Sequence, residues 1–83
     1  MPVILESARK HGKTNDDILH AWNNALGFYD IEADHEPPKA LAIGPDLAGN
    51  LLEVIYLELE EADVVIHAMT LQPKYLPLLG DSA

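Results

Sequence analysis

The sequence has no cysteine and little positive charge: five lysine and arginine residues stand against 14 aspartates and glutamates. The absence of cysteine excludes disulfides and thiolate metal sites, and it suits a reducing compartment. The net charge of −9 argues against non-specific binding of nucleic acid, because such binding neutralises phosphates with lysine and arginine. We therefore predict no DNA partner.

Long hydrophobic runs are also missing. No segment approaches the ~20 apolar residues that cross a bilayer, so no membrane association is predicted. The first residues, Met1 to Glu6, lack the basic start and the apolar stretch of a signal peptide. We expect a soluble, cytoplasmic protein. A length of 83 residues with 48% hydrophobic residues predicts a single domain, 1–83, with its own core.

The pattern along the chain predicts helices followed by strands. Thr14 and Asp17 have the spacing of a capping box, which predicts a helix over 15–26. Residues 3–11 suggest a short helix that ends at Gly12, with a strand over 2–6 as the alternative. Strands are predicted over 28–33, 39–43, 51–59 and 64–71, and Pro73 opens a last helical turn. The predicted fold class is α+β: N-terminal helices packed on a small antiparallel β-sheet meander, with a short C-terminal helical turn.

The predicted strands 51–59 and 64–71 are apolar on both faces, so both faces need cover. If Leu59 pairs with Val64, Tyr56 lies opposite His67. The helices then cover the face with Glu53, Ile55, Leu57, Leu59, Ile66, Ala68 and Thr70. A partner, a second copy or a substrate covers the face with Leu52, Val54, Tyr56, Val65, His67 and Met69. A slip of one residue would exchange these two sets.

Two polar residues interrupt the apolar strands. An imidazole at His67 can act as a general acid or base, or it can be a packed histidine that bonds to a carbonyl or to Tyr56. The carboxyl of Glu53 can act as an acid catalyst, or it can pair with Thr70, a backbone group or an N-terminal lysine. Both residues are therefore candidates for a site, each with a purely structural alternative.

The basic residues near the N-terminus form the second candidate feature. Arg9, Lys10, His11 and Lys13 can hold a phosphate backbone, or they can form a solvated surface that offsets acidity elsewhere. Lys74 and Tyr75 at the start of the last turn can join them, or Tyr75 can pack on the sheet as a lid.

The chain shows no pattern typical of a metal or cofactor site. The four histidines include no His-x₃-His pair, and the acidic run 30–36 matches no calcium loop. We predict no metal and no cofactor. A small-ligand or cation site in the loop 30–36 is the weakest of the hypotheses.

Four short segments together resemble the BrnT-type toxins of bacterial toxin–antitoxin pairs. They are Ala-Arg-Lys-His-Gly at 8–12, Ala-Ile-Gly at 42–44, Gly-Asn-Leu-Leu-Glu-Val at 49–54 and Val-Ile-His-Ala-Met at 65–69. The resemblance covers residues 6–76. It implies a ribonuclease fold like that of the RelE toxins and an antitoxin partner. It also implies RNA cleavage without a metal, with the 2′-hydroxyl as nucleophile.

One departure from the family divides the functional prediction. The last strand of BrnT-type toxins ordinarily reads Ile-Ser-Ala-Arg, and here Met69 replaces the functional arginine. The first hypothesis is a toxin-like endoribonuclease whose predicted catalytic residues are His67, Arg9, Lys74 and Tyr56, and whose predicted RNA-binding residues are Lys10, His11, Lys13 and Tyr75. The second is a catalytically inactive module of the same fold, which forms a dimer or other homo-oligomer or binds an antitoxin protein.

Overall fold

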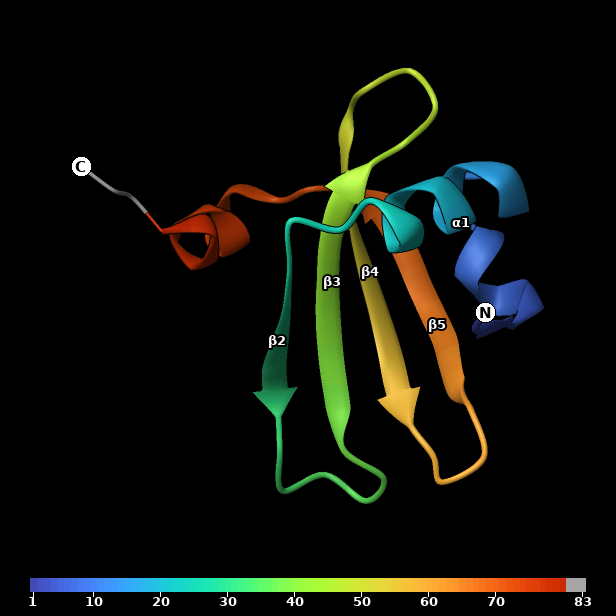
Figure 1. The fold of residues 1–83 in the computed structure, drawn as a ribbon, viewed down its shortest axis with the longest axis vertical. Coiled ribbons are helices and arrows are strands. Elements are labelled where there is room, and N and C mark those ends of the chain that lie inside the picture. Colours follow the sequence, from blue (N-terminus) through green and yellow to red (C-terminus); the bar gives the residue numbers. More distant parts are fainter. Residues whose placement is uncertain (81–83) are drawn as a thin grey trace.

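The computed structural model describes residues 1–80, which form one five-stranded sheet with helical segments around it (Figure 1). In chain order the elements are β1 (Val3–Ile4), η1 (Glu6–Arg9), α1 (Asn15–Asn23), β2 (Gly27–Glu32), β3 (Lys39–Pro45), β4 (Leu51–Glu58), β5 (Asp63–Thr70) and η2 (Pro73–Leu79). The strand order is β1-β5-β4-β3-β2. The α+β class is confirmed. The sheet is mixed, however, because β1 pairs with β5 in parallel.

The N-terminal segment differs from the predicted helix. Val3 pairs with Val64 and Ile4 with Val65, so the alternative of a strand is right at these two residues. Of the predicted helix over 3–11, only Glu6–Arg9 is helical, as a 3-10 helix, and Ala8 within it is fully buried. β-branched residues such as Val3 and Ile4 favour a pleated, half-buried surface over a helix, and the free edge of β5 supplies one.

The helix α1 begins as its sequence predicts. The Thr14 hydroxyl accepts a hydrogen bond from the Asp17 backbone N–H at 3.1 Å and donates one to the Asp17 carboxylate, also at 3.1 Å. The helix ends at Asn23, three residues before the predicted boundary, and both the backbone N–H and the side chain of Asn24 bond to the His20 carbonyl. Because of this early end, Leu26 is 63% exposed and takes no part in the core.

The helix approaches β3 most closely at Gly44. A Cβ atom at this position would collide with the backbone carbonyl oxygen of Ala21 and would lie 3.0 Å from the Cα of Ala25. Backbone this close to backbone leaves room only for glycine. The glycine therefore sets the depth at which α1 packs on the sheet.

The hairpin of β4 and β5 contains a β-bulge that the sequence pattern did not predict. Tyr56 pairs with Val65 and Ile55 with His67, so Ile66 is an extra residue on β5. The expected pairing of Tyr56 with His67 is therefore wrong. The expected division of the two faces is wrong as well, because α1 packs on the face of Leu52, Val54 and Tyr56. A bulge changes the alternation of side chains that a regular strand would keep.

Three aromatic rings extend the core on the α1 face of the sheet. The Trp22 and Tyr56 rings lie 4.8 Å apart, the Trp22 and Phe28 rings 5.4 Å, and the Phe28 and Tyr56 rings 6.2 Å, all edge to face. Edge-to-face geometry is the arrangement that aromatic pairs prefer. We call these three residues the aromatic trio. Tyr56 is 6% exposed, whereas Phe28 is 52% exposed at its border.

Burial raises the pKa of Tyr56 to about 12, and the nearby carboxylates of Glu58, Asp63 and Asp30 act in the same direction. An unfolded tyrosine ionises near pH ~10, so between these values the unfolded chain loses a proton that the folded chain keeps. We therefore expect the free energy of unfolding to fall as the pH rises from about 10 to about 12. Denaturant titrations of the protein and of Tyr56→Phe across this range measure the effect. An equal fall in both proteins would contradict it.

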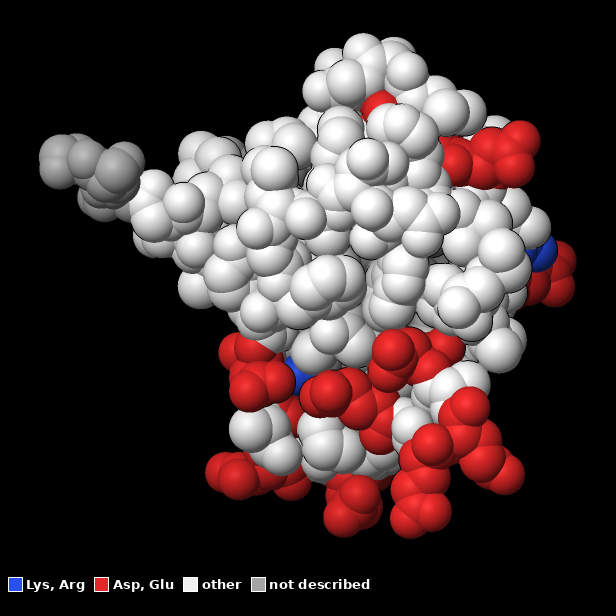
Figure 2. Space-filling view, in the orientation of Figure 1, with Lys and Arg blue, Asp and Glu red and all other residues white. Residues whose placement is uncertain are grey.

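Acidic side chains are concentrated at one end of the sheet. Figure 2 shows acidic side chains gathered where the chain turns from β2 to β3 and from β4 to β5. We call this region the acidic end. Its carboxylates belong to Asp30, Glu32, Asp34, Glu36, Glu58, Glu60, Glu61 and Asp63.

The part of the chain that the structure describes contains no helix long and apolar enough to cross a membrane.

Candidate functional site

Glu53 is fully buried, and hydrogen bonds satisfy both of its carboxylate oxygens. Oε2 lies 2.9 Å from Nε2 of His67 and accepts from the Gln72 side-chain amide at 2.8 Å. Oε1 accepts from the Gln72 backbone N–H at 2.8 Å. A buried carboxylate is tolerated when such donors replace the lost water. The three donors therefore explain how an acidic residue can stand inside an apolar strand.

The β-bulge is what turns His67 toward Glu53. In an unbroken register beyond the Tyr56–Val65 pair, His67 would pair with Val54, which is on the face covered by α1. The extra residue, Ile66, shifts His67 to the opposite face, beside Ile55 and within reach of Glu53. Bulges next to functional sites commonly redirect a side chain in this way.

A second imidazole lies against the first. The rings of His11 and His67 are 5.3 Å apart with an angle of 74° between their planes. His11 is exposed, and it follows η1 just before Gly12, whose φ of 85° turns the chain. His67 keeps 24% of its side chain exposed. One histidine is thus anchored to a buried carboxylate, and the other is free to meet a ligand.

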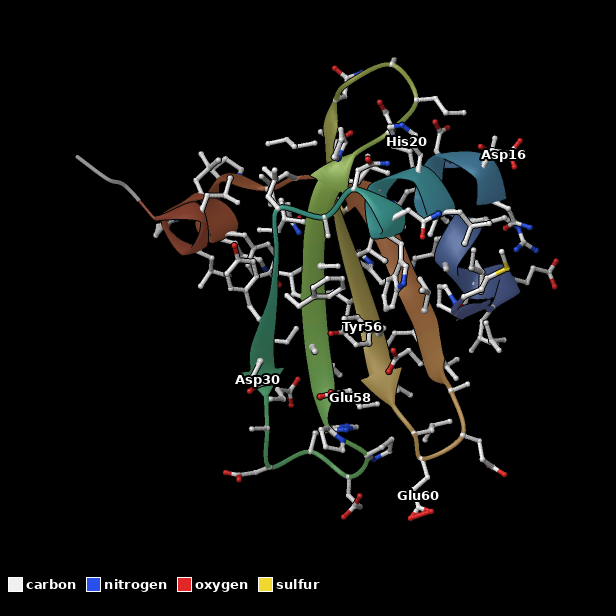
Figure 3. All side chains as sticks on the ribbon, in the orientation of Figure 1. Asp16, His20, Asp30, Tyr56, Glu58 and Glu60 are labelled. Atoms are coloured by element: carbon white, nitrogen blue, oxygen red, sulfur yellow. The ribbon has the colours of Figure 1, made fainter. Side chains whose placement is uncertain are left out.

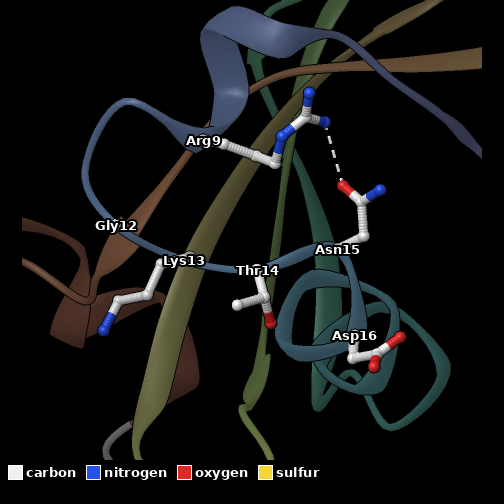
Figure 4. A pocket seen from close by; sticks show the side chains of 6 residues that line it. All are labelled: Arg9, Gly12, Lys13, Thr14, Asn15 and Asp16. Carbon is white, nitrogen blue, oxygen red and sulfur yellow. Dashed lines mark hydrogen bonds between the residues drawn. The ribbon is translucent and has the colours of Figure 1, made fainter.

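The basic residues lie beside His11 along the chain. Arg9 Nη1 donates to Asn15 Oδ1 at 3.0 Å, and Arg9 and Lys13 line a shallow pocket with Gly12, Thr14, Asn15 and Asp16 (Figure 4). Lys10 lines a neighbouring pocket together with Arg9. Arg9 therefore lines both pockets and connects Lys10 with Lys13, whereas His11 lines neither pocket.

The other predicted site residues are placed differently. Tyr56 lies on the α1 face, packed against Trp22, so the expected cooperation with His67 is wrong because the sheet separates the two. The Nζ of Lys74 lies 5.1 Å from the centre of the Tyr75 ring, and both residues belong to η2. Figure 1 shows η2 beyond β2 and η1 beyond β5, so Lys74 and Tyr75 do not join the basic residues of the N-terminal segment. The residue just before η2 is Gln72, whose two hydrogen bonds to Glu53 hold the start of η2 against the sheet.

Sequence reasoning selected Glu53 and His67 separately but did not predict that they bond to each other. It also missed Gln72, which supplies two of the three donors to Glu53. The only signal in the sequence is a polar residue directly after the last apolar strand.

Within residues 1–80, no group of three or more histidine, aspartate or glutamate side chains is arranged to hold a metal ion.

No protein-family model, curated protein or solved structure matches this chain. The function is therefore inferred from the side chains themselves. A fold can support many activities, whereas the geometry of a site restricts the chemistry that it can perform.

Replacing Glu53 with glutamine is expected to lower the free energy of unfolding by about 1–3 kcal/mol. In either orientation the amide places its NH₂ group against at least one of the donors from His67 and Gln72. Chemical denaturation measures the change. The matched control is Glu60→Gln, which removes the same charge at an exposed position. We expect its free energy of unfolding to stay within about 0.5 kcal/mol of that of the native protein. Equal effects at the two positions would show that the buried network contributes nothing.

Proposed function

We propose that this chain is a toxin-like endoribonuclease of a toxin–antitoxin pair, which cleaves single-stranded RNA without a metal. The observation that supports the proposal is the histidine pair: His67 anchored to the buried Glu53, with the His11 ring 5.3 Å away. Two imidazoles can supply both proton transfers of RNA cleavage near neutral pH.

The hydrogen bond to Glu53 assigns the roles. An ionised carboxylate can only accept, so in the neutral form of His67 the proton is on Nε2 and Nδ1 has a lone pair. In the proposed reaction Nδ1 removes the proton of a ribose 2′-hydroxyl, and the 2′-oxygen attacks the adjacent phosphorus. The bond from phosphorus to the 5′-oxygen breaks, and protonated His11 gives its proton to that oxygen. The products are a 2′,3′-cyclic phosphate and a 5′-hydroxyl end.

The charge distribution favours RNA binding on the His11 side. Arg9, Lys10 and Lys13 surround His11 in the chain, and they are proposed to bind phosphates on either side of the cleaved bond. Lys74 and Tyr75 lie in η2, on the flank of the sheet away from η1, and they take no part in the proposed site (Figure 1). The acidic end repels phosphate, which restricts the RNA to the basic side. In this proposal the histidine pair performs the task of the arginine that Met69 replaces.

The test is incubation of the purified protein, free of any antitoxin, with single-stranded RNA in a buffer that contains EDTA. Cleavage is expected, with cyclic phosphate at the new 3′ ends. A Glu53→Gln variant should retain less activity than Glu60→Gln, because only the first change disturbs His67. Intact RNA after prolonged incubation with the native protein would overturn the proposal.

One observation favours the second candidate, a catalytically inactive module that self-associates or binds a protein. Leu57 pairs with Val64 on the face opposite α1, and both are only partly buried there, as is the neighbouring Ile55. A partner that covers these side chains would remove apolar surface from water. Sedimentation of the native protein over a wide concentration range tests self-association. A persistent monomer would count against the homo-oligomer.

A further inference from the structure

A row of side chains on the α1 face connects the aromatic trio to the acidic end. Asp30 pairs with Ala40, and Ala40 pairs with Tyr56, so only a methyl group separates the carboxylate from the tyrosine (Figure 3). Glu58 follows Tyr56 by two residues on β4 and shares this face. Asp63 is directly opposite Glu58. Three carboxylates and an aromatic surface therefore meet at one place.

The hydroxyl of Tyr56 has no hydrogen-bond partner among residues 1–80. The residue is nevertheless 6% exposed, and its ring is enclosed by Trp22 and Phe28. Every fully buried side-chain nitrogen or oxygen atom in residues 1–80 has a hydrogen-bond partner. Because the Tyr56 hydroxyl has none, its oxygen must remain in contact with solvent. The strand register puts Tyr56 on the same face as Asp30, Glu58 and Asp63, and their negative charges add to the rise in its pKa. Tyr56 thus shares a face with three acids, and its hydroxyl bonds to none of them.

Within residues 1–80, no lysine or arginine forms an ion pair with these three carboxylates. Lys39 is the only lysine or arginine of β2, β3, β4 and β5, and it bonds to Glu32 at 3.1 Å. Lys39 pairs with Leu57, which puts it on the opposite face from Ala40 and Tyr56. No other ion pair to an acid of this region forms within the described part of the chain. Glu58 and Asp63 stand opposite each other as like charges, an arrangement that costs stability when nothing neutralises it.

We propose that the aromatic trio and the carboxylates of Asp30, Glu58 and Asp63 form a docking site for an arginine side chain of a basic partner polypeptide. A guanidinium can stack on the exposed Phe28 ring and donate to the carboxylates and to the Tyr56 oxygen. Its five donors in a planar fork match this mixture of flat rings and carboxylates better than the compact ammonium of lysine or a metal ion does. RNA is the wrong partner for this surface, because its phosphates would face unpaired carboxylates. The inference stands on its own and does not depend on RNA cleavage.

Trp22 is the single tryptophan of the chain, so its fluorescence reports directly on this site. The experiment titrates the full chain with an N-acetylated tetra-arginine peptide and, separately, with tetra-lysine and with calcium. A saturable fluorescence change is expected with tetra-arginine, at lower concentrations than with tetra-lysine. The double variant Asp30→Asn/Glu58→Gln is expected to weaken binding about tenfold or more, as the loss of charge-assisted hydrogen bonds implies.

The matched control is Glu60→Gln/Glu61→Gln, which removes the same two charges from the exposed turn between β4 and β5. It should weaken binding only slightly, because charges in the exposed turn are screened by salt. Tyr56→Phe, a conservative variant that keeps the ring, should also weaken binding. If the two double variants lose the same affinity for tetra-arginine, the peptide binds only through general attraction to negative charge, and the proposal is overturned. Absence of saturation, or an equal response to calcium, would overturn it too.

Discussion

Alanine in place of His67 is expected to lower the rate of RNA cleavage by about 100-fold or more, the usual contribution of a positioned general base. The imidazole bonds to the buried Glu53 and lies 5.3 Å from the ring of His11, and alanine has no group that can accept a proton in its place. Cleavage of a labelled oligonucleotide under single-turnover conditions measures the loss. The variant should be less stable but still folded, because Glu53 loses one donor and keeps the two hydrogen bonds from Gln72.

The control for this variant is His35→Ala. His35 is also an imidazole that bonds to an oxygen, here the Pro37 carbonyl at 2.6 Å, but it lies in the exposed turn after β2. This control should cleave RNA at the native rate. His11→Ala should lose activity on the scale of His67→Ala, and the double variant should lose little more than either, because residues that act as a unit are not additive. Native activity in His67→Ala would remove the histidine from the mechanism.

The largest expected loss of stability comes from Gly44→Ala. One methyl group there would collide with the Ala21 carbonyl oxygen and press on the Ala25 Cα, so α1 would have to move away from β3. Overpacking usually lowers the free energy of unfolding by about 1–3 kcal/mol. Here the added methyl group meets backbone atoms, which cannot move aside as a side chain can, so we expect a loss of about 3 kcal/mol or more. A melting temperature lower by about 12 °C or more is expected, since small domains lose at least ~4 °C per kcal/mol.

Gly27→Ala is the matched control because it adds the same methyl group to another strand. There the methyl would meet the hydroxyl end of Tyr29, a side chain that can rotate away. The control should therefore cost much less stability than Gly44→Ala. Equal melting temperatures for the two variants would show that the close approach of α1 to β3 does not limit the packing.

Local chemistry explains the parts of the fold that could be predicted. The hydrogen bonds between Thr14 and Asp17 involve neighbours in the sequence, so the start of α1 follows from the capping box alone. The strands after α1 follow from apolar runs separated by turn residues. The N-terminal segment was harder, because Val3 and Ile4 extend only through pairing with β5, which is distant in the sequence.

The β-bulge limited what could be predicted about the site. The run Val64–Ile66 is uniformly β-branched, and nothing in it marks Ile66 as the extra residue. Without the bulge, the alternation of the strand places Tyr56 and His67 together, whereas the structure separates them by the sheet. The Glu53–His67 bond and the two hydrogen bonds from Gln72 depend on the same shift. Contacts of this kind depend on tertiary register, which composition and spacing do not contain.

The proximity of His11 and His67 was likewise not visible in the sequence, where 55 positions separate the two residues. The positive φ of Gly12 and the packing of Ala8 hold the end of η1 against β5. Each of these features is recognisable alone as a turn glycine or a small core residue. Their joint effect on the histidine pair appears only once β1 is placed beside β5.

A DNA oligonucleotide with a single ribonucleotide tests the central claim most directly. Only one 2′-hydroxyl is present, so a reaction that uses it as the nucleophile can break only the bond that follows it. The account predicts cleavage at that bond in the presence of EDTA, a cyclic phosphate on the ribonucleotide, and loss of both in His67→Ala. An uncut oligonucleotide, cleavage at deoxyribonucleotides, or unchanged cleavage by His67→Ala would contradict it.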